Sequence, residues 1–272
     1  MNPEDLRRYL EFYQDLGIDS LYQNGAEKSC GADPLVCSGP PGPLAATTEG
    51  PAGPGGPAQT RGSAPQNQAQ EPDHNLPPLA PPGESLFQIL EDIGDCHRCR
   101  LHEGRNKLVF GVGNDHSPLV FVGEGPGADE DAQGIPFVGR AGQLLTQMIE
   151  NTARKEGINI TRADVYICNV VKCRPPGNRT PEPDEMEICG QFLYRQLRSI
   201  KPKAICVLGG TAARAITGRK EGVTKLRGKW FDWEKIPVMV TYHPSFLLRP
   251  YNQDAKREAW EDLKKVLHFV YD

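Results

Sequence analysis

Short apolar runs alternate with longer amphipathic stretches through residues 84–272. Four of the runs are apolar at nearly every position, as in strands buried on both faces, and lie at 119–122, 165–171, 204–208 and 238–241. Apolar residues three and four positions apart predict helices over 85–93, 142–156, 184–200, from 211 and over 253–269. Strands separated by helices pair in parallel, so we predict a three-layer α/β/α fold with a central, mainly parallel four-stranded sheet.

The first third of the chain has a different pattern. Apolar residues three and four positions apart predict a short amphipathic helix over residues 3–16. Residues 29–83 are rich in Pro, Gly, Ala, Gln and Ser and contain few large apolar residues, which predicts a disordered linker. We therefore divide the chain into a helical segment (1–28), a linker (29–83) and a folded domain (84–272). The helix either packs on the domain or docks with a repair or replication protein.

Charge is divided unevenly along the chain, whose net charge is −4. Residues 1–83 hold 4 basic and 10 acidic side chains, whereas residues 84–272 hold 27 basic and 25 acidic ones. This weakly basic balance neither requires nor excludes nucleic acid, because local patches set the affinity for phosphate. Candidates for such a patch are Arg174, Arg179, Arg214, Arg219, Lys220, Lys225, Arg227 and Lys229. A solvated surface explains these residues equally well.

The N-terminus does not resemble a secretory signal. Residues 1–5 lack a basic start and an apolar run, and no stretch approaches the ~20 apolar residues of a membrane helix. We expect a cytoplasmic protein that acts as a monomer. In that reducing compartment, eight cysteines favour thiolate ligation of a metal over disulfide bonds.

Four cysteines have the arrangement of a metal site. They are Cys96, Cys99, Cys173 and Cys189. The first two form a C-x2-C pair after a predicted helix, and the third leads into an irregular Pro-Gly segment that can wrap a cluster. Four thiolates suit tetrahedral zinc and an iron–sulfur cluster alike, and their spacing does not separate the two. Cys168 and Cys206 lie inside apolar runs as core thiols would, and Cys30 and Cys37 fall in the linker.

A glycine-rich turn, GEGPG at 123–127, follows the first apolar run. The turn lacks the Lys-Ser/Thr ending of a P-loop and the glycine spacing of a Rossmann fingerprint, which disfavours a nucleotide cofactor. Glu124 within it can hold a water molecule, and Phe137 farther along the chain can return as a stacking platform. A plain core position is the alternative for Phe137.

Three motifs in order along the chain resemble one family. They are GEGPGADEDAQGIPFVGRAGQLL at 123–145, NVVKCRPPGNRTPEPDE at 169–185 and HPSFLL at 243–248. Together with the four cysteines, they resemble the family 4 uracil-DNA glycosylases, the iron–sulfur branch of the uracil-DNA glycosylase superfamily, over residues 86–270. Three separate motifs in the right order are far more specific than any one alone.

The resemblance implies a cofactor and a base pocket. Cys96, Cys99, Cys173 and Cys189 would bind a structural [4Fe–4S] cluster. Phe137 would stack on a flipped uracil, and the amide of Asn169 would donate to O4 and accept from N3–H. Cytosine presents an amino group at C4 and no N3–H, so this pairing selects uracil. A buried capping role is the alternative for Asn169.

The same resemblance implies the catalytic groups. His243 would donate a hydrogen bond to O2 of the departing uracil, and Glu124, with Asn178, would orient or activate the attacking water. Family-1 enzymes use an Asp one position beyond this glutamate, where the chain has glycine, which leaves open whether Glu124 is a base or a water anchor. Contacts with phosphate or with the base edge are expected from Gly125, Gly127 and Arg249.

The predicted function is that of a monofunctional uracil-DNA glycosylase. It would flip uracil out of single- or double-stranded DNA and hydrolyse the N-glycosidic bond, leaving an abasic site for base excision repair. No lysine is an obvious Schiff-base nucleophile. Two alternatives remain at this point: a non-catalytic iron–sulfur module that binds nucleic acid beside a polymerase, and a zinc-binding nucleotide hydrolase.

Overall fold

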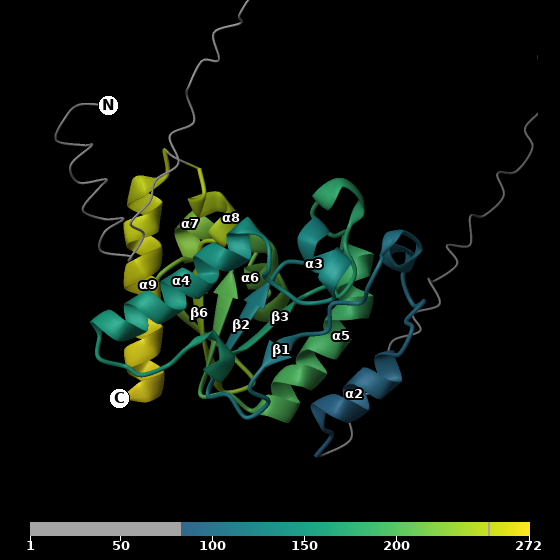
Figure 1. Cartoon of the computed structure of the whole chain (residues 1–272), viewed down its shortest axis with the longest axis horizontal. Helices are drawn as coiled ribbons and strands as arrows, with labels where there is room; N and C mark the ends of the chain where they lie inside the picture. The colour runs from purple at the N-terminus through teal and green to yellow at the C-terminus, as the bar shows by residue number, and fades with distance from the viewer. Residues whose placement is uncertain (1–82, 250) are drawn as a thin grey trace, which may run out of the picture. The chain divides into compact units, whose positions relative to one another are not determined.

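The computed structural model describes residues 83–249 and 251–272, and in them a six-stranded sheet lies between two layers of helices (Figure 1). The sheet order is β1-β3-β2-β4-β6-β5. Its four central strands are parallel: β3 (Tyr166–Asn169), β2 (Leu119–Gly123), β4 (Ala204–Leu208) and β6 (Ile236–Thr241). The predicted N-terminal helix and linker lie outside the described residues.

The predicted fold class is confirmed, but the sheet has six strands rather than four. The added strands are antiparallel edges, β1 (Val112–Gly113) beside β3 and β5 (Trp230–Trp233) beside β6. The sequence prediction missed them because β1 has two residues and β5 alternates exposed with half-buried positions. Neither contains the continuous apolar run that marks a doubly covered strand.

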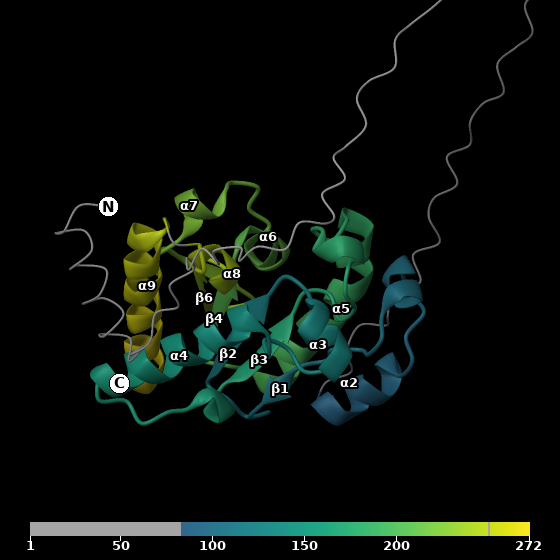
Figure 2. The ribbon, with the colours of Figure 1, turned by 45° about the horizontal axis from the view of Figure 1, so that its top comes forward.

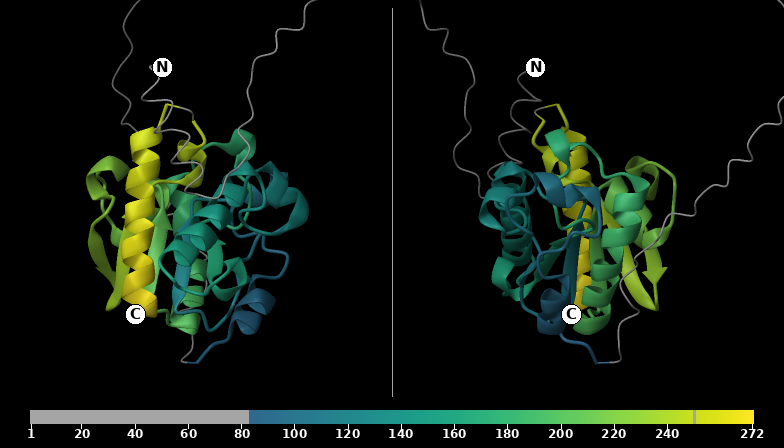
Figure 3. Two further views of the ribbon diagram at one scale, coloured as in Figure 1. Left: turned by 60° about the vertical axis from the view of Figure 1, so that its left-hand side comes forward. Right: turned by 90° about the vertical axis from the view of Figure 1, so that its right-hand side faces the viewer.

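Alternate residues of each central strand face opposite helical layers. In β2, Leu119 and Phe121 pack against one layer, and Val120 and Val122 pack against the other. The first layer contains α4 (Arg140–Lys155) and α9 (Gln253–Tyr271); the second contains α5 (Pro183–Ile200) and α6 (Gly210–Thr217). Figure 3 shows the sheet between these helices. Both faces of the sheet are therefore buried, as the apolar runs predicted.

Helix α2 (Leu86–Ile93) begins and ends where the sequence predicted. Ser85 caps its N-terminus through the backbone N–H of Gln88, and Gly94 caps its C-terminus. The helix lies beside α5, on the opposite side of the sheet from α9 (Figure 2). Arg195 of α5 holds its start and its last turn by ion pairs with Glu84 and Asp92. These ion pairs tie the start of the described chain to α5.

Short helices fill the connections. They are η1 (Arg100–Gly104), α3 (Ala128–Gln133), η2 (Arg162–Asp164), η3 (Pro176–Asn178), α7 (Val223–Leu226) and α8 (Pro244–Leu247). No helix among the described residues is long and apolar enough to cross a membrane.

The register of the parallel strands brings their carboxyl ends to one edge of the sheet. Gly123 pairs with Asn169, and Leu208 pairs with Thr241. The glycine-rich turn, the segment after β3, the start of α6 and the His243 turn all leave the sheet at this edge. Ligands of open α/β sheets bind at such an edge.

Candidate active site

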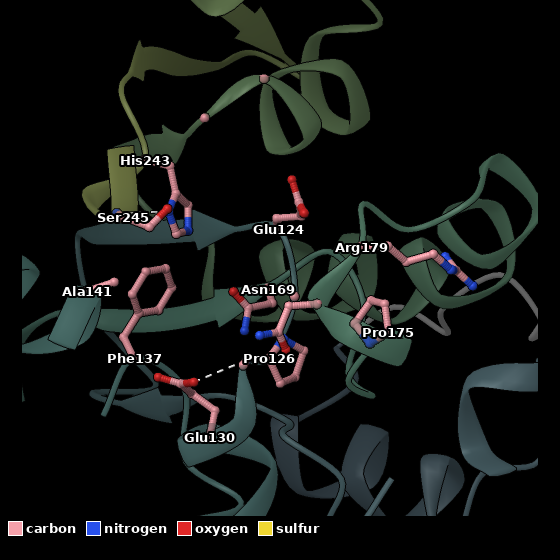
Figure 4. Close-up of a pocket in the computed structure, with 15 residues that line it drawn as sticks. Glu124, Pro126, Glu130, Phe137, Ala141, Asn169, Pro175, Arg179, His243 and Ser245 are labelled. Atoms are coloured by element: carbon pink, nitrogen blue, oxygen red, sulfur yellow. Dashed lines mark hydrogen bonds between the residues drawn. The ribbon is translucent and has the colours of Figure 1, made fainter. Parts of the chain in front are cut away.

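A cavity of about 330 Å³ opens at the carboxyl edge of the parallel strands (Figure 4). Seven residues predicted from the sequence line it, namely Glu124, Gly125, Gly127, Phe137, Asn169, Asn178 and His243. The other lining residues are Pro126, Glu130, Ala141, Pro175, Arg179, Gly209, Gly210 and Ser245. The three motifs, which lie between residues 123 and 248, therefore meet around one space.

Asn169 ends β3 with its amide buried beside this cavity. The side chain is 1% exposed, and its Oδ1 has no hydrogen-bond partner among the described residues. A Cβ at position 123 would overlap Oδ1 and come within 2.5 Å of Cζ of Phe137, so Gly123 provides the room for both groups. A buried acceptor without a partner costs roughly 1–3 kcal/mol, which a ligand N–H can recover. A capping role for Asn169 does not explain this acceptor.

Phe137 forms one wall of the cavity with its backbone in the left-handed region. Its φ is +54°, which is uncommon for an aromatic residue, and the side chain is 6% exposed. A Cβ at position 142 would overlap the Phe137 carbonyl, so Gly142 permits helix α4 to start directly against this residue. The ring centroid lies 5.7 Å from that of His243. A ligand in the cavity can contact the edge or face of this ring.

Glu130 connects the two glycine-rich turns that carry these groups. Its carboxylate accepts the backbone N–H groups of Gly127 at 3.1 Å and of Val138 and Gly139 at 2.9 Å. Glu130 was not among the residues predicted from the sequence, although Gly127-x-x-Glu130 has the spacing of a capping box. Glu130 thus fixes the residues that follow Phe137.

His243 is held as a neutral imidazole. The backbone N–H of Ser245 donates to its Nδ1 at 3.2 Å, and the Ser245 hydroxyl lies 2.8 Å from the same atom. Because a backbone N–H can only donate, Nδ1 is the acceptor and Nε2 carries the proton. Burial lowers the pKa of His243 to about 4, so the ring stays uncharged at neutral pH. Figure 4 shows His243 and Phe137 approaching one another across the cavity.

Glu124 follows β2 and faces the start of α6. The hydroxyl of Thr211 in the first turn of that helix donates to Oε2 of the carboxylate. Glu124 therefore lies beside the N-terminus of α6, across the cavity from Phe137 (Figure 4).

Comparisons with known proteins identify a family. Residues 110–264, more than half of the chain, match the model of the Uracil DNA glycosylase superfamily. The Type-4 uracil-DNA glycosylase of Thermotoga maritima is 47% identical over 190 residues, which are 69% of this chain and 96% of that protein. The chain belongs to the type-4 branch of this superfamily. Two further relatives carry the same family name. The Type-4 uracil-DNA glycosylase of Archaeoglobus fulgidus is 43% identical and matches 67% of this chain and 92% of that protein. The one of Sulfurisphaera tokodaii is 42% identical and matches 67% of this chain and 84% of that protein.

In this type-4 family member, Asn178 and Arg179 complete the rim of the cavity. Asn178 has a φ of +56°, and its Oδ1 accepts from Nε of Arg174 at 2.7 Å. Arg179 binds both oxygens of the buried Glu185, at 2.7 and 2.8 Å, and this contact contributes most to lowering the pKa of Glu185 to about 2. The charge of Arg179 is therefore largely balanced within the protein. The hydrogen bond from Arg174 to Asn178 goes instead to an amide oxygen, which carries no charge.

Arg249 lies apart from the predicted residues that line the cavity. It is exposed, and its guanidinium lies 5.8 Å from the ring of Phe246, which stacks on Tyr242. Leu247 is 1% exposed and belongs to the core. Leu247 therefore packs internally, whereas the Arg249 side chain is exposed, as a contact with phosphate requires.

The four cysteines predicted to bind a cofactor lie in one region next to the cavity. Cys96 and Cys99 lie between α2 and η1, Cys173 follows β3, and Cys189 is on α5. Burial raises the pKa of Cys99, Cys173 and Cys189, and neighbouring thiols of the set raise each of these values further. N–H groups reach three of the sulfurs, from Lys172 to Cys189 at 3.2 Å, Arg105 to Cys173 at 3.4 Å and Arg98 to Cys96 at 3.6 Å.

The donor set is four thiols. Within residues 83–249 and 251–272, no group of three His, Cys, Asp or Glu side chains that could hold one metal ion is found. Four thiolates are the usual ligands of a four-iron cluster, and they also suit tetrahedral zinc. N–H donors directed at sulfur are a usual means of tuning iron–sulfur clusters.

Lys172 is buried between the cysteines and the end of β3. Its side chain is 0% exposed, and Nζ donates to the Asn169 carbonyl at 2.8 Å and to Oε1 of Gln196 at 2.6 Å. The backbone N–H of the same residue donates to Cys189. Lys172 therefore joins the end of β3 to helix α5 in the protein interior.

Proposed function

We propose that the protein is a uracil-DNA glycosylase that hydrolyses the N-glycosidic bond of deoxyuridine in DNA. One observation carries this proposal beyond family membership. Three groups lie around a single cavity. They are the Phe137 ring, the neutral His243 and the Asn169 Oδ1, which has no hydrogen-bond partner within residues 83–249 and 251–272. This combination complements a pyrimidine that has an N3–H group and that leaves as an anion.

Base recognition would depend on the amide of Asn169. Oδ1 would accept from N3–H of uracil, and the amide N–H would donate to O4. Cytosine offers an amino group and an unprotonated N3, so both contacts would fail. Phe137 would stack on the ring, and extrusion of the nucleotide from the helix would bring the base within reach.

Bond cleavage would separate charge within the cavity. As the C1′–N1 bond breaks, the sugar becomes positive and uracil becomes negative at O2. The Nε2–H of His243 would donate to O2, as preorganised donors do in other sites where an oxyanion develops. Glu124, with Asn178, would orient the water whose oxygen bonds to C1′, and the water proton would pass to solvent or to this carboxylate.

The product would be an abasic site with an intact DNA backbone. Among the described residues that line the cavity, none is a lysine. Strand cleavage through a Schiff base requires an amine at C1′, so the lining supports a monofunctional enzyme. Uracil-containing DNA is the partner that this proposal requires; a monomeric state, a repair or replication protein docked on residues 1–28 and a cytoplasmic location stay predictions.

The proposal is tested by incubating the protein with a 5′-labelled single-stranded oligonucleotide that contains one uracil. We expect free uracil and an alkali-labile site, with no strand break before alkali. The same oligonucleotide with cytosine should stay intact. Absence of uracil release from protein with its full metal content would contradict the proposal and favour a binding module without catalysis.

Cys96, Cys99, Cys173 and Cys189 would bind a [4Fe–4S] cluster. The cluster would hold together the segment before η1, the segment after β3 and helix α5, which is a structural role. Because Cys173 and Asn169 are connected through a four-residue step along the chain, this arrangement would also steady the end of β3.

Anaerobically purified protein is expected to contain about four iron atoms and four sulfides per chain. Cys173→Ser should lose most of the iron, since one of the four thiolates is removed. Cys206→Ala is the matched control, because Cys206 lies inside β4 and should not change the iron content. Zinc in place of iron and sulfide would contradict the cluster and favour the hydrolase alternative.

Deletion of residues 1–83 is expected to leave uracil excision from short oligonucleotides nearly unchanged. Glu84 and its ion pair with Arg195 are retained in this deletion. Deletion of residues 1–94 is the comparison, because it removes Ile89 and Ile93 from the core beside Phe192. The shorter protein should melt at a distinctly lower temperature. A collapse of activity in the first deletion would show that the N-terminal segment belongs to the catalytic fold.

A further inference from the structure

The backbone of Phe137 requires support from its surroundings. A non-glycine residue in the left-handed region costs about 1–3 kcal/mol and persists where neighbouring groups fix it. Glu130 fixes the residues after Phe137, through Val138 and Gly139. The residue before Phe137 is Pro136. Because proline has no backbone N–H, its carbonyl is the backbone group through which this residue can be held by a hydrogen bond.

Arg162 holds this carbonyl from a distant part of the chain. It lies in η2, and its Nη2 donates to the Pro136 carbonyl at 2.7 Å. Its own backbone N–H donates to Oε1 of Glu150 in α4 at 3.1 Å. The backbone of Arg162 is therefore held on α4, and its guanidinium is directed at the turn that carries Phe137.

A second path from Arg162 reaches Phe137 through helix α4. Nη1 of Arg162 donates to Oγ1 of Thr146 at 3.0 Å, and this hydroxyl donates to the Gly142 carbonyl at 3.1 Å. Gly142 in turn lies against the Phe137 carbonyl, with no room for a side chain between them. The two paths enclose the Phe137 backbone between Pro136 and the first turn of α4.

We propose that Arg162 is a positioning residue that sets the orientation of the Phe137 ring for stacking on the flipped base. This inference rests on the proposed function and adds a residue outside the cavity lining. Arg162 touches neither substrate nor the reacting atoms, and it acts through the Pro136 carbonyl and the Thr146 hydroxyl. A charged donor is suited to this task because charge-assisted hydrogen bonds are shorter and stronger than neutral ones.

The test compares Arg162→Met with Arg162→Lys in the full-length protein. Methionine keeps much of the length but removes both hydrogen bonds, and we expect a loss of about tenfold in kcat/KM for uracil release and a similarly weaker inhibition by free uracil. Lysine retains one donor and should recover part of the loss. Thr146→Val, which cuts the second path alone, should lose less than Arg162→Met.

A double-mutant cycle separates positioning from general stability. In a Phe137→Ala background, Arg162→Met should cause little further loss of kcat/KM or of uracil inhibition, while its effect on the melting temperature should be unchanged. An equal further loss in that background, or an Arg162→Met enzyme as active as the wild type, would overturn the inference. A wild-type protein that releases no uracil would instead defeat the proposed function and this inference with it.

Discussion

Replacing His243 with alanine is expected to slow uracil release by about 10²–10³-fold at saturating DNA, because one preorganised donor to the developing anion is removed. The KM for DNA should change little, since the contact with O2 strengthens mainly in the transition state. Single-turnover release of uracil from a labelled oligonucleotide measures this rate directly. An alanine variant within threefold of the wild type would exclude His243 as the group that stabilises the leaving base.

Ser245→Ala is the matched control for this variant. It removes the hydroxyl near Nδ1 but keeps the backbone N–H that fixes the tautomer, so we expect a small effect. The pH profile gives a second check. The pKa of His243 is lowered to about 4, so the ring is neutral above about pH 5 and becomes protonated as the pH falls through 4. The rate should therefore show no titration of this residue near pH 6.5.

Asn169→Asp is expected to reduce uracil release by at least about 10²-fold. A carboxylate cannot donate to O4, and it introduces a negative charge beside a base that becomes negative. Sites built to hydrogen-bond a substrate reject an unmatched partner strongly, because buried polar groups are then left unpaired. The ratio of uracil release to cytosine release, measured with matched oligonucleotides, should be lower for the variant than for the wild type.

Asn169→Leu serves as the control without charge. It keeps a side chain of similar size and removes both hydrogen bonds, so uracil release should fall while release of cytosine stays undetectable. If both variants release uracil at the wild-type rate, the cavity does not recognise the base through Asn169. The unpartnered Oδ1 would then need another explanation.

The sequence predicted the central fold well because its signals were local. Ser85 and Gly94 mark the ends of α2 by cap chemistry, and the run at 204–208 coincides with β4. The run at 165–171 was longer than β3, which ends at Asn169, because the two valines that follow are buried although they leave the strand. An apolar run reports burial, and burial continues past the end of this strand.

The residues that line the cavity were predicted from motifs, whereas the residues that hold them in place were not. Phe137, Asn169 and His243 were expected from the family resemblance, and the structure brings them together around the cavity. Glu130 has a local signal in its capping-box spacing, which was not used. Arg162 was missed because its partners, the Pro136 carbonyl and the Thr146 hydroxyl, lie far from it along the chain. A carbonyl such as that of Pro136 has no sequence signature, so contacts of this kind become visible when the turn is folded.

The order of the strands has a consequence for when activity arises during folding. Phe137 and Asn169 follow β2 and β3, whereas His243 follows β6, which joins the sheet through β4. Pairing β2 with β4 closes a longer loop than pairing β2 with β3 or β4 with β6, and long-range contacts of this kind form late. A chain in which β2 and β4 were not yet paired would hold Phe137 and Asn169 in one half of the sheet and His243 in the other. Turnover would therefore be the last property gained on folding and the first lost when the two halves separate.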